Sequence, residues 1–217
     1  LGTKSIADAL AKLFPSASIM RFDTDTLKKD RLDQHYTAVS RGEVDILVGT
    51  QMLAKGLDLP RLGFVGVVSA DTSLSFPDYT AAERTYQMLV QVLGRVGRGH
   101  RAGSAVVQTH QPGSPAILAA LNKDWEAFYS AEIAERRKYN FPPFCHLLKL
   151  TCSRKTIAGA MKAATTFSTQ LRSDYPELTI DGPSPSFYEK SAGSYRWQII
   201  IRARNRSALS TIASNLP

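Results

Sequence analysis

The residues with the clearest chemical potential are the glutamine and arginines of segment 91–98, which has the form Q-x-x-G-R-x-G-R. The segment closes a stretch, 81–93, in which apolar residues recur at helical spacing. Gln91 and Arg95 therefore lie about one helical turn apart. Arg95 and Arg98 are three positions apart, so both guanidinium groups can face one phosphate group with their planar donor forks.

Two glycines of the same segment, Gly94 and Gly97, let the backbone pass close to a ligand. An arginine placed beside a transferring phosphoryl group stabilises its charge, which is worth about 10³–10⁵ in rate in nucleotide hydrolases. Segment 91–98 thus predicts contact with nucleotide phosphates. The alternative is a solvated basic helix end that the helix dipole favours.

A second candidate segment, 48–58, begins at the end of a short apolar run, 45–49. Ligands of open α/β sheets bind at the carboxyl ends of the strands. Thr50 offers backbone and hydroxyl donors to a phosphate at a helix start, and Asp58, which follows Gly56, can accept hydrogen bonds from a ribose hydroxyl. The alternative is an ordinary strand–turn–helix with a capping threonine.

The elements that must position these segments alternate between strand and helix through the first half of the chain. The predicted strands are 18–22, 45–49, 63–69 and 103–109, with helical patterns between them, as at 81–93. Short β-rich runs separated by helices indicate a parallel sheet that is covered on both faces. We therefore expect an α/β lobe.

The second half of the chain has a different order of elements, and the Pro- and Gly-containing segment 111–115 marks the boundary. The expected elements are helices at 115–121 and 123–138, a strand at 144–152, a helix at 157–171, strands at 178–180 and 195–203, and a last helix. The run Gly182-Pro183-Ser184-Pro185 is expected to break the chain between two of the strands. This order predicts a smaller, open α+β domain.

Composition narrows the class of protein. Hydrophobic residues make up 43% of the chain, which excludes wholesale disorder, and no apolar run approaches the roughly 18 residues of a membrane span. Two cysteines are too few for a disulfide framework. The net charge is +8, and residues 111–217 carry 14 basic and 8 acidic side chains. Such a surface suits a polyanion such as nucleic acid, or an acidic protein tail; the alternative is a solvated basic face.

The stretch from Tyr195 to Arg206 combines aromatic and cationic side chains, as sites for single-stranded DNA do. Tyr195 and Trp197 continue the every-second-residue pattern of Ile199 and Ile201. This pattern places both rings on the same face as the isoleucines and favours the core of a half-buried strand for them. The arginines of this stretch remain available to bind.

Segments 48–58 and 91–98 resemble motifs V and VI of the second helicase superfamily in order and spacing. Further landmarks make the resemblance more specific and extend it over nearly the whole chain. They are Gly2-Thr3, Arg21-Phe22-Asp23-Thr24-Asp25-Thr26, Gly49-Thr50-Gln51-Met52-Leu53-Ala54-Lys55-Gly56, Ala82-Glu83-Arg84, Gln108-Thr109-His110, Ala134-Glu135-Arg136-Arg137, Phe141-Pro142-Pro143-Phe144, Gly182-Pro183-Ser184-Pro185 and Tyr195-Arg196-Trp197. The chain resembles the family of bacterial primosomal protein N-prime, the replication-restart DNA helicase.

The resemblance implies a function and a set of site residues. Members of this family use ATP to unwind DNA in the 3′-to-5′ direction at stalled or repaired replication forks, and restart replication by assembling the primosome. The resemblance makes Gln91, Arg95 and Arg98 contacts of the ATP phosphates, with Arg98 as the inserted arginine. It places Gly56, Asp58, Gly94 and Gly97 near the nucleotide, Thr50, Gln51 and Arg84 at the DNA–ATP coupling surface, and Arg196, Arg202 and Arg206 on DNA.

The resemblance also implies parts that this sequence lacks. It contains no phosphate-binding G-x-x-x-x-G-K-[ST] loop and no acidic box that holds a metal ion. We therefore expect a fragment with a RecA-like second helicase lobe at 1–111, a helical connector at 112–140 and a truncated α+β C-terminal domain at 141–217. ATP with Mg²⁺ would be held mainly by the missing lobe, and the fragment alone would be inactive. Zinc is expected in the full-length protein only, and no metal in this chain.

The expected partners are branched and single-stranded DNA, the acidic tail of the single-strand-binding protein, for which Arg206 is the contact, and other primosome proteins. The expected place is the bacterial cytoplasm, in association with the nucleoid. Two alternatives stay open: another DNA translocase of the same superfamily, and a non-catalytic module that binds DNA or protein and retains the lobe as a scaffold.

Overall fold

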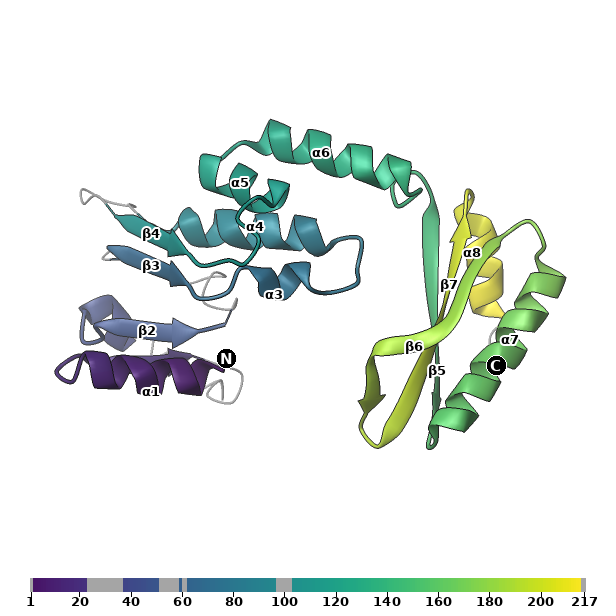
Figure 1. Ribbon diagram of the computed structural model, residues 1–217, viewed down its shortest axis with the longest axis horizontal. Helices are drawn as coiled ribbons and strands as arrows, with labels where there is room; N and C mark the ends of the chain where they lie inside the picture. Colours follow the sequence, from purple (N-terminus) through teal and green to yellow (C-terminus); the bar gives the residue numbers. More distant parts are fainter. Residues whose placement is uncertain (1, 23–36, 51–58, 60–61, 97–102, 216–217) are drawn as a thin grey trace. The chain divides into compact units, whose positions relative to one another are not determined.

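The computed structural model describes residues 2–22, 37–50, 59, 62–96 and 103–215. The chain divides into two compact units (Figure 1). The first joins Leu1–Ser75 with Thr80–Phe128, and the second joins Phe76–Tyr79 with Tyr129–Pro217. Among the described residues, no helix combines the length and the apolar character that crossing a membrane requires.

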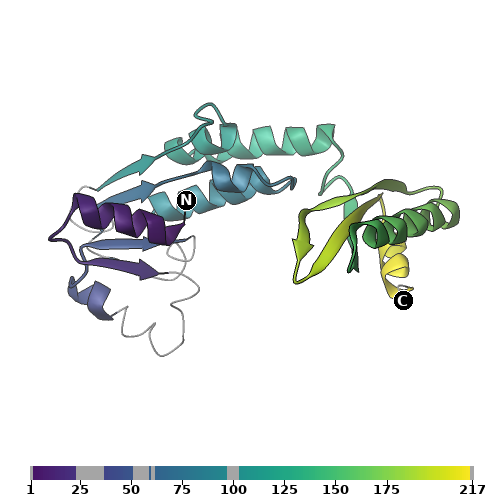
Figure 2. The same cartoon turned by 60° about the horizontal axis from the view of Figure 1, so that its bottom comes forward.

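The first unit contains two pairs of parallel strands (Figure 2). Strand β1 (Ile19–Phe22) pairs with β2 (Ile46–Gly49), and β3 (Phe64–Val67) pairs with β4 (Ser104–Val107). Parallel neighbours require a crossover between them. The parallel pairing therefore agrees with the predicted alternation of strands and helices, and the unit is of mixed α/β class. The described strands form two two-stranded sheets, however, and not the single parallel sheet that the sequence predicts.

The helices of the first unit accompany these strands. They are α1 (Thr3–Leu13), α3 (Asp71–Leu74), α4 (Ala81–Leu93) and α5 (Pro115–Asn122), and residues 37–41 are also helical. Helix α6 (Trp125–Lys138) begins in the first unit, and its later residues belong to the second. Helix α4 has the bounds that the sequence predicts.

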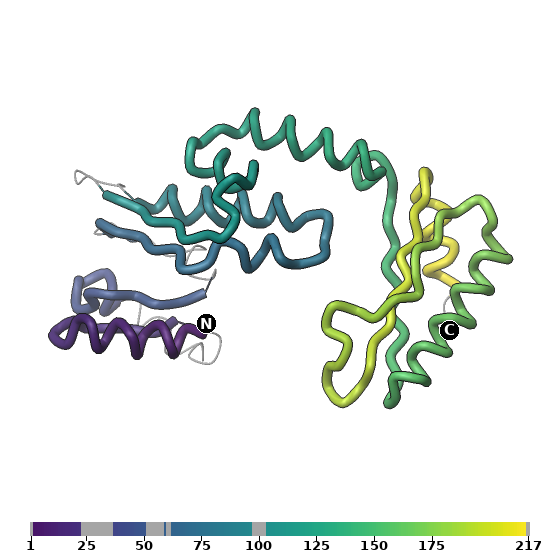
Figure 3. The backbone as a smooth tube through the Cα atoms, viewed as in Figure 1, coloured from purple at the N-terminus to yellow at the C-terminus, as the bar shows by residue number. Residues whose placement is uncertain are grey.

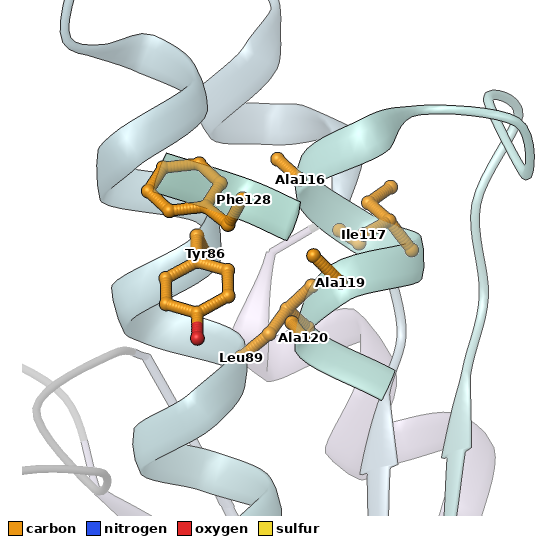
Figure 4. Close-up of a cluster of buried hydrophobic side chains, with 8 residues drawn as sticks. Tyr86, Leu89, Ala116, Ile117, Ala119, Ala120 and Phe128 are labelled. Atoms are coloured by element: carbon orange, nitrogen blue, oxygen red, sulfur yellow. The ribbon is translucent and has the colours of Figure 1, made fainter. Parts of the chain in front are cut away.

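The core of the first unit lies between α4 and α5 (Figure 4). Leu89 and Ile117 are almost completely buried there, at 0% and 1% exposure. The ring of Tyr86 stacks on that of Phe128, with centroids 4.1 Å apart and planes 7° apart. One face of α4 is thereby fixed against α5, which leaves its opposite face to solvent.

The second unit is built on an antiparallel sheet in the order β5-β7-β6. Its elements in chain order are β5 (His146–Arg154), α7 (Ile157–Asp174), β6 (Thr179–Ser191), β7 (Ser194–Ala203) and α8 (Arg206–Ser214). The tube in Figure 3 follows the hairpin of β6 and β7. This order of strands and helices is the predicted one and confirms the α+β class.

Helices α7 and α8 share one core with the sheet of the second unit. Ile199 and Ile201 of β7 have 0% exposure and lie with Leu171 of α7 and Leu209 of α8. Trp197 packs against the same cluster. The alternation of β7 thus places Trp197 on the core side, as the sequence favoured.

The expected break at 182–185 is wrong. Strand β6 continues through Gly182-Pro183-Ser184-Pro185, with shifts of register between Asp181 and Ser184 and between Pro185 and Lys190. An edge strand tolerates proline because one side of it has no partner strand. Gly182 has φ +95°, and a Cβ there would lie 3.0 Å from the carbonyl oxygen of Gln198, so a glycine suits the first irregularity.

Candidate functional site

The end of α4 carries the described part of segment 91–98. Gln91 lies exposed in the last turn, and Arg95 follows the cap residue Gly94 and is half-buried. The amide of Arg95 donates to the carbonyl oxygen of Val92 at 3.1 Å, so the chain is still turning at this point. Gln91 and Arg95 therefore follow each other by about one turn, as the spacing predicts.

Gly94 has a local structural role in addition to any role beside a ligand. Its amide donates to the carbonyl oxygen of Val90 at 2.9 Å. A Cβ at Gly94 would lie 2.9 Å from the same oxygen, closer than real side chains come. The glycine thus allows α4 to end tightly.

The solvent side of α4 forms a polar stripe. Arg84, Gln87 and Gln91 are exposed, and they lie on the face opposite buried Thr85 and Leu89. Gln87, in the middle of the stripe, donates a hydrogen bond from its Nε2 to Glu83 Oε1 at 2.9 Å. A ligand at the end of α4 would meet Gln91 first, with Arg84 two turns away along the same face.

Several predicted site residues lie outside the described residues. They are Gln51, Gly56, Asp58, Gly97 and Arg98. Thr50 is described: it follows β2 directly and is exposed. It therefore stands at the carboxyl end of a parallel strand, where the sequence placed it.

The ends of β3 and β4 hold a polar contact that the sequence did not reveal. Asp71 is 8% exposed, and its two carboxylate oxygens accept hydrogen bonds from Thr109 Oγ1 at 2.7 Å and from the amide of His110 at 2.9 Å. These two hydrogen bonds hold the pKa of Asp71 below its ordinary value, and the bond from the Thr109 hydroxyl has the larger effect. Thr109 and His110 are among the family landmarks of the sequence, but nothing local points from them to Asp71.

The predicted DNA-binding arginines of the second unit differ in their surroundings. Arg202 Nε donates to Asp181 Oδ2 at 2.7 Å, its Nη1 donates to the carbonyl oxygen of Tyr139 at 3.0 Å, and its guanidinium lies 5.1 Å from the ring centre of Phe141. Arg206 is exposed at the start of α8. Arg196 is half-buried on β7, and its guanidinium has no hydrogen bond, ion pair or ring contact with any described residue.

Within the part of the chain that the structure describes, neither cysteine joins a group of side chains that could hold a metal ion. Cys145 is buried and its Sγ donates to the carbonyl oxygen of Asn140 at 2.9 Å, whereas Cys152 packs against the core of the second unit. Burial raises the pKa of both thiols, which disfavours the thiolate that a metal needs. Among the described residues, no group of three or more His, Cys, Asp and Glu side chains could hold a metal ion.

Two family models match the chain, one in each half. The model of the helicase conserved C-terminal domain matches residues 2–100, and the model of the primosomal protein N C-terminal domain matches residues 137–217. The replication restart protein PriA of Bacillus subtilis is 37% identical over 217 residues, which are 99% of this chain and 27% of that protein. The chain belongs to the PriA family of replication restart proteins. The resemblance drawn from its sequence motifs is thereby confirmed.

Other PriA proteins align in the same way. The one from Treponema pallidum is 38% identical over 214 residues, 98% of this chain and 33% of that protein. The one from Synechocystis is 38% identical over 209 residues, 93% of this chain and 24% of that protein. The chain thus spans about a quarter to a third of the length of these PriA relatives.

Proposed function

We propose that this chain supplies the second, RecA-like helicase lobe and the C-terminal domain of an ATP-dependent DNA helicase. That protein moves 3′-to-5′ on DNA, acts at stalled or repaired replication forks and restarts replication by primosome assembly. Membership of the PriA family supports the role, and the parallel pairing of β1 with β2 and of β3 with β4 supports the lobe. The proposed parts are the lobe at 1–111, a connector at 112–140 and the C-terminal domain at 141–217.

The observation that carries the proposal is the placement of Gln91 and Arg95 about one turn apart at the end of α4. An exposed amide donor and a guanidinium, one turn apart, form a donor set that suits the oxygens of a nucleotide phosphate. Bound ATP with Mg²⁺ supplies a phosphoryl group whose transfer to water releases the energy for movement. Gln91 and Arg95 would orient the terminal phosphates, and Arg98 would stabilise the charge that develops there.

The remaining nucleotide and DNA contacts follow from the family and from position. Gly56, Asp58, Gly94 and Gly97 would lie beside the nucleotide. Thr50, Gln51 and Arg84 would couple ATP binding to DNA, which the exposure of Thr50 and Arg84 permits. The sequence contains no phosphate-binding loop, so another lobe would supply that part of the ATP site and the residues named here would supply the rest. The chain alone would therefore not hydrolyse ATP. Zinc belongs to the rest of the full-length protein.

The second unit would contact branched and single-stranded DNA. The guanidinium of Arg196 has no hydrogen bond or ion pair with any described residue, so its charge is available to a phosphate. Arg206 is exposed and would meet either DNA or the acidic tail of the single-strand-binding protein. Arg202 already holds Asp181 and the carbonyl of Tyr139, so its part in DNA binding would be the smallest of the three. Other primosome proteins would complete the set of partners.

The test compares two glutamines of the α4 stripe in the full-length protein. Gln91→Ala should lower DNA-stimulated ATP hydrolysis at least about tenfold, because a donor that orients the terminal phosphates is lost. Gln87→Ala is the matched control, since it lies one turn earlier and bonds to Glu83. Equal turnover in the two variants would overturn the assignment of Gln91.

A further inference from the structure

Two consecutive aromatic residues of β6 are exposed together. Phe187 is 54% exposed and Tyr188 is 63% exposed. Their ring centres lie 5.0 Å apart, with planes at 79°. Adjacent exposed rings form a continuous apolar patch, and such patches often mark binding sites, so this pair is a candidate binding surface.

An irregularity of the strand accounts for the joint exposure. Neighbouring side chains of a regular strand point to opposite faces, and only one of the two would then leave the core. The pairing of β6 with β7 shifts its register between Pro185 and Lys190, the interval that contains Phe187 and Tyr188. Bulges of this kind redirect side chains and occur near functional sites.

A third aromatic side chain, Phe76, contacts both rings. Phe76, which belongs to the same compact unit, has its ring centre 5.1 Å from that of Phe187 and 6.4 Å from that of Tyr188. Phe76 itself is only half-buried in this contact. A ligand would therefore meet two pre-positioned ring surfaces and would spend little of its binding energy on ordering them.

A cationic side chain follows the pair closely in the chain. Residues 190–217 carry five basic and no acidic side chains, and Glu189 stands between Tyr188 and Lys190. Lys190 is exposed, with its Nζ 5.4 Å from the ring centre of Tyr195. Rings that stack on bases, beside cations that meet phosphates, form the chemistry of a site for single-stranded nucleic acid.

We propose that Phe187 and Tyr188 form a base-stacking site for unpaired DNA on the β6–β7 hairpin, with Lys190 on its phosphates. The proposal deepens the proposed function, on which it rests. Trp197, an aromatic residue that the sequence offered for base stacking, packs against the core. The exposed rings of Phe187 and Tyr188 are therefore better placed to stack on bases.

The test measures binding of a fluorescent oligothymidylate and of an abasic oligonucleotide of equal length to the 217-residue chain. The double variant Phe187→Ala/Tyr188→Ala should bind oligothymidylate about 5- to 100-fold more weakly, and should bind the abasic strand as the unmodified chain does. Leu13→Ala/Phe14→Ala is the matched control, since these neighbours are exposed by 71% and 52% at the end of α1. The control should leave both affinities unchanged.

The outcomes separate the two proposals. If the unmodified chain binds both strands and the double variant weakens both equally or neither, base stacking at this pair is overturned while DNA contact stands. If the unmodified chain binds neither strand at low salt, DNA contact itself is overturned. A second variant, Phe187→Trp, guards against misfolding: it should retain affinity, and its fluorescence should be quenched by oligothymidylate but not by the abasic strand. Absence of that quenching would also overturn the proposal.

Discussion

Asp71 and Thr109 are 38 residues apart in sequence, yet Thr109 Oγ1 donates a hydrogen bond of 2.7 Å to Asp71 Oδ1. The contact joins the segment after β3 to the segment after β4, and the amide of His110 adds a second bond to the same carboxylate. Because these segments follow a parallel strand pair, the contact fixes the sheet edge at which helix α3 begins. It is a structural tie within the first unit.

The Asp71 contact predicts a dependence of stability on pH. The pKa of Asp71 is lower in the folded chain than its ordinary value of 3.8, so the unfolded state binds the proton more readily. The stabilisation is fully present above 3.8 and is lost as the pH falls through the lower folded value. Urea unfolding should show that Asp71→Asn is less stable than the unmodified chain at pH 7, with a difference that shrinks in acid. Asp8→Asn, at an exposed position of α1, is the control and should show no such difference.

Two neighbouring residues of α4 should respond very differently to truncation. Leu89 is completely buried against α5, whereas Val90 is 38% exposed. Leu89→Ala should lower the free energy of unfolding by about 2–5 kcal/mol, because it leaves a cavity. Val90→Ala should cost less than about 1 kcal/mol. Chemical denaturation of both variants checks this, and similar losses would show that the buried face of α4 is assigned wrongly.

Arg202 should matter for stability in a way that Arg204 does not. The planar guanidinium of Arg202 donates hydrogen bonds to Asp181 and to the carbonyl of Tyr139, and it also lies over the ring of Phe141. A lysine cannot make these three contacts together. Since the ion pair is partly exposed, Arg202→Lys should cost only about 1–2 kcal/mol in free energy of unfolding. The exposed Arg204→Lys should stay within about 0.5 kcal/mol of the unmodified chain. A neutral effect of Arg202→Lys in thermal unfolding would contradict this role.

Local patterns were enough to predict many of the elements. The apolar spacing of 81–93 reproduces the bounds of α4, and the predicted strand at 45–49 lies within one residue of β2. The spacing of Gln91 and Arg95 follows from the helix itself, so their relation at its end was also predictable. These features depend on neighbours in sequence.

Features that depend on distant residues could not be predicted in the same way. The edge position of β6, which allows it to continue through Pro183 and Pro185, is a property of the whole sheet. The exposure of Phe187 follows from a register shift against β7, and the tie of Asp71 to Thr109 follows from the pairing of β3 with β4. None of these partners is adjacent in sequence.

The central claim is that segment 91–98 completes an ATP site in the full-length protein. The most direct test is DNA-stimulated ATP hydrolysis by Arg98→Ala, with DNA binding measured in parallel. The account predicts a fall in turnover of about 10³ or more, with DNA affinity nearly unchanged, because the variant loses charge stabilisation at the phosphates. Lys12→Ala, at an exposed position of α1, should behave as the unmodified protein does. Normal turnover in Arg98→Ala would contradict the account.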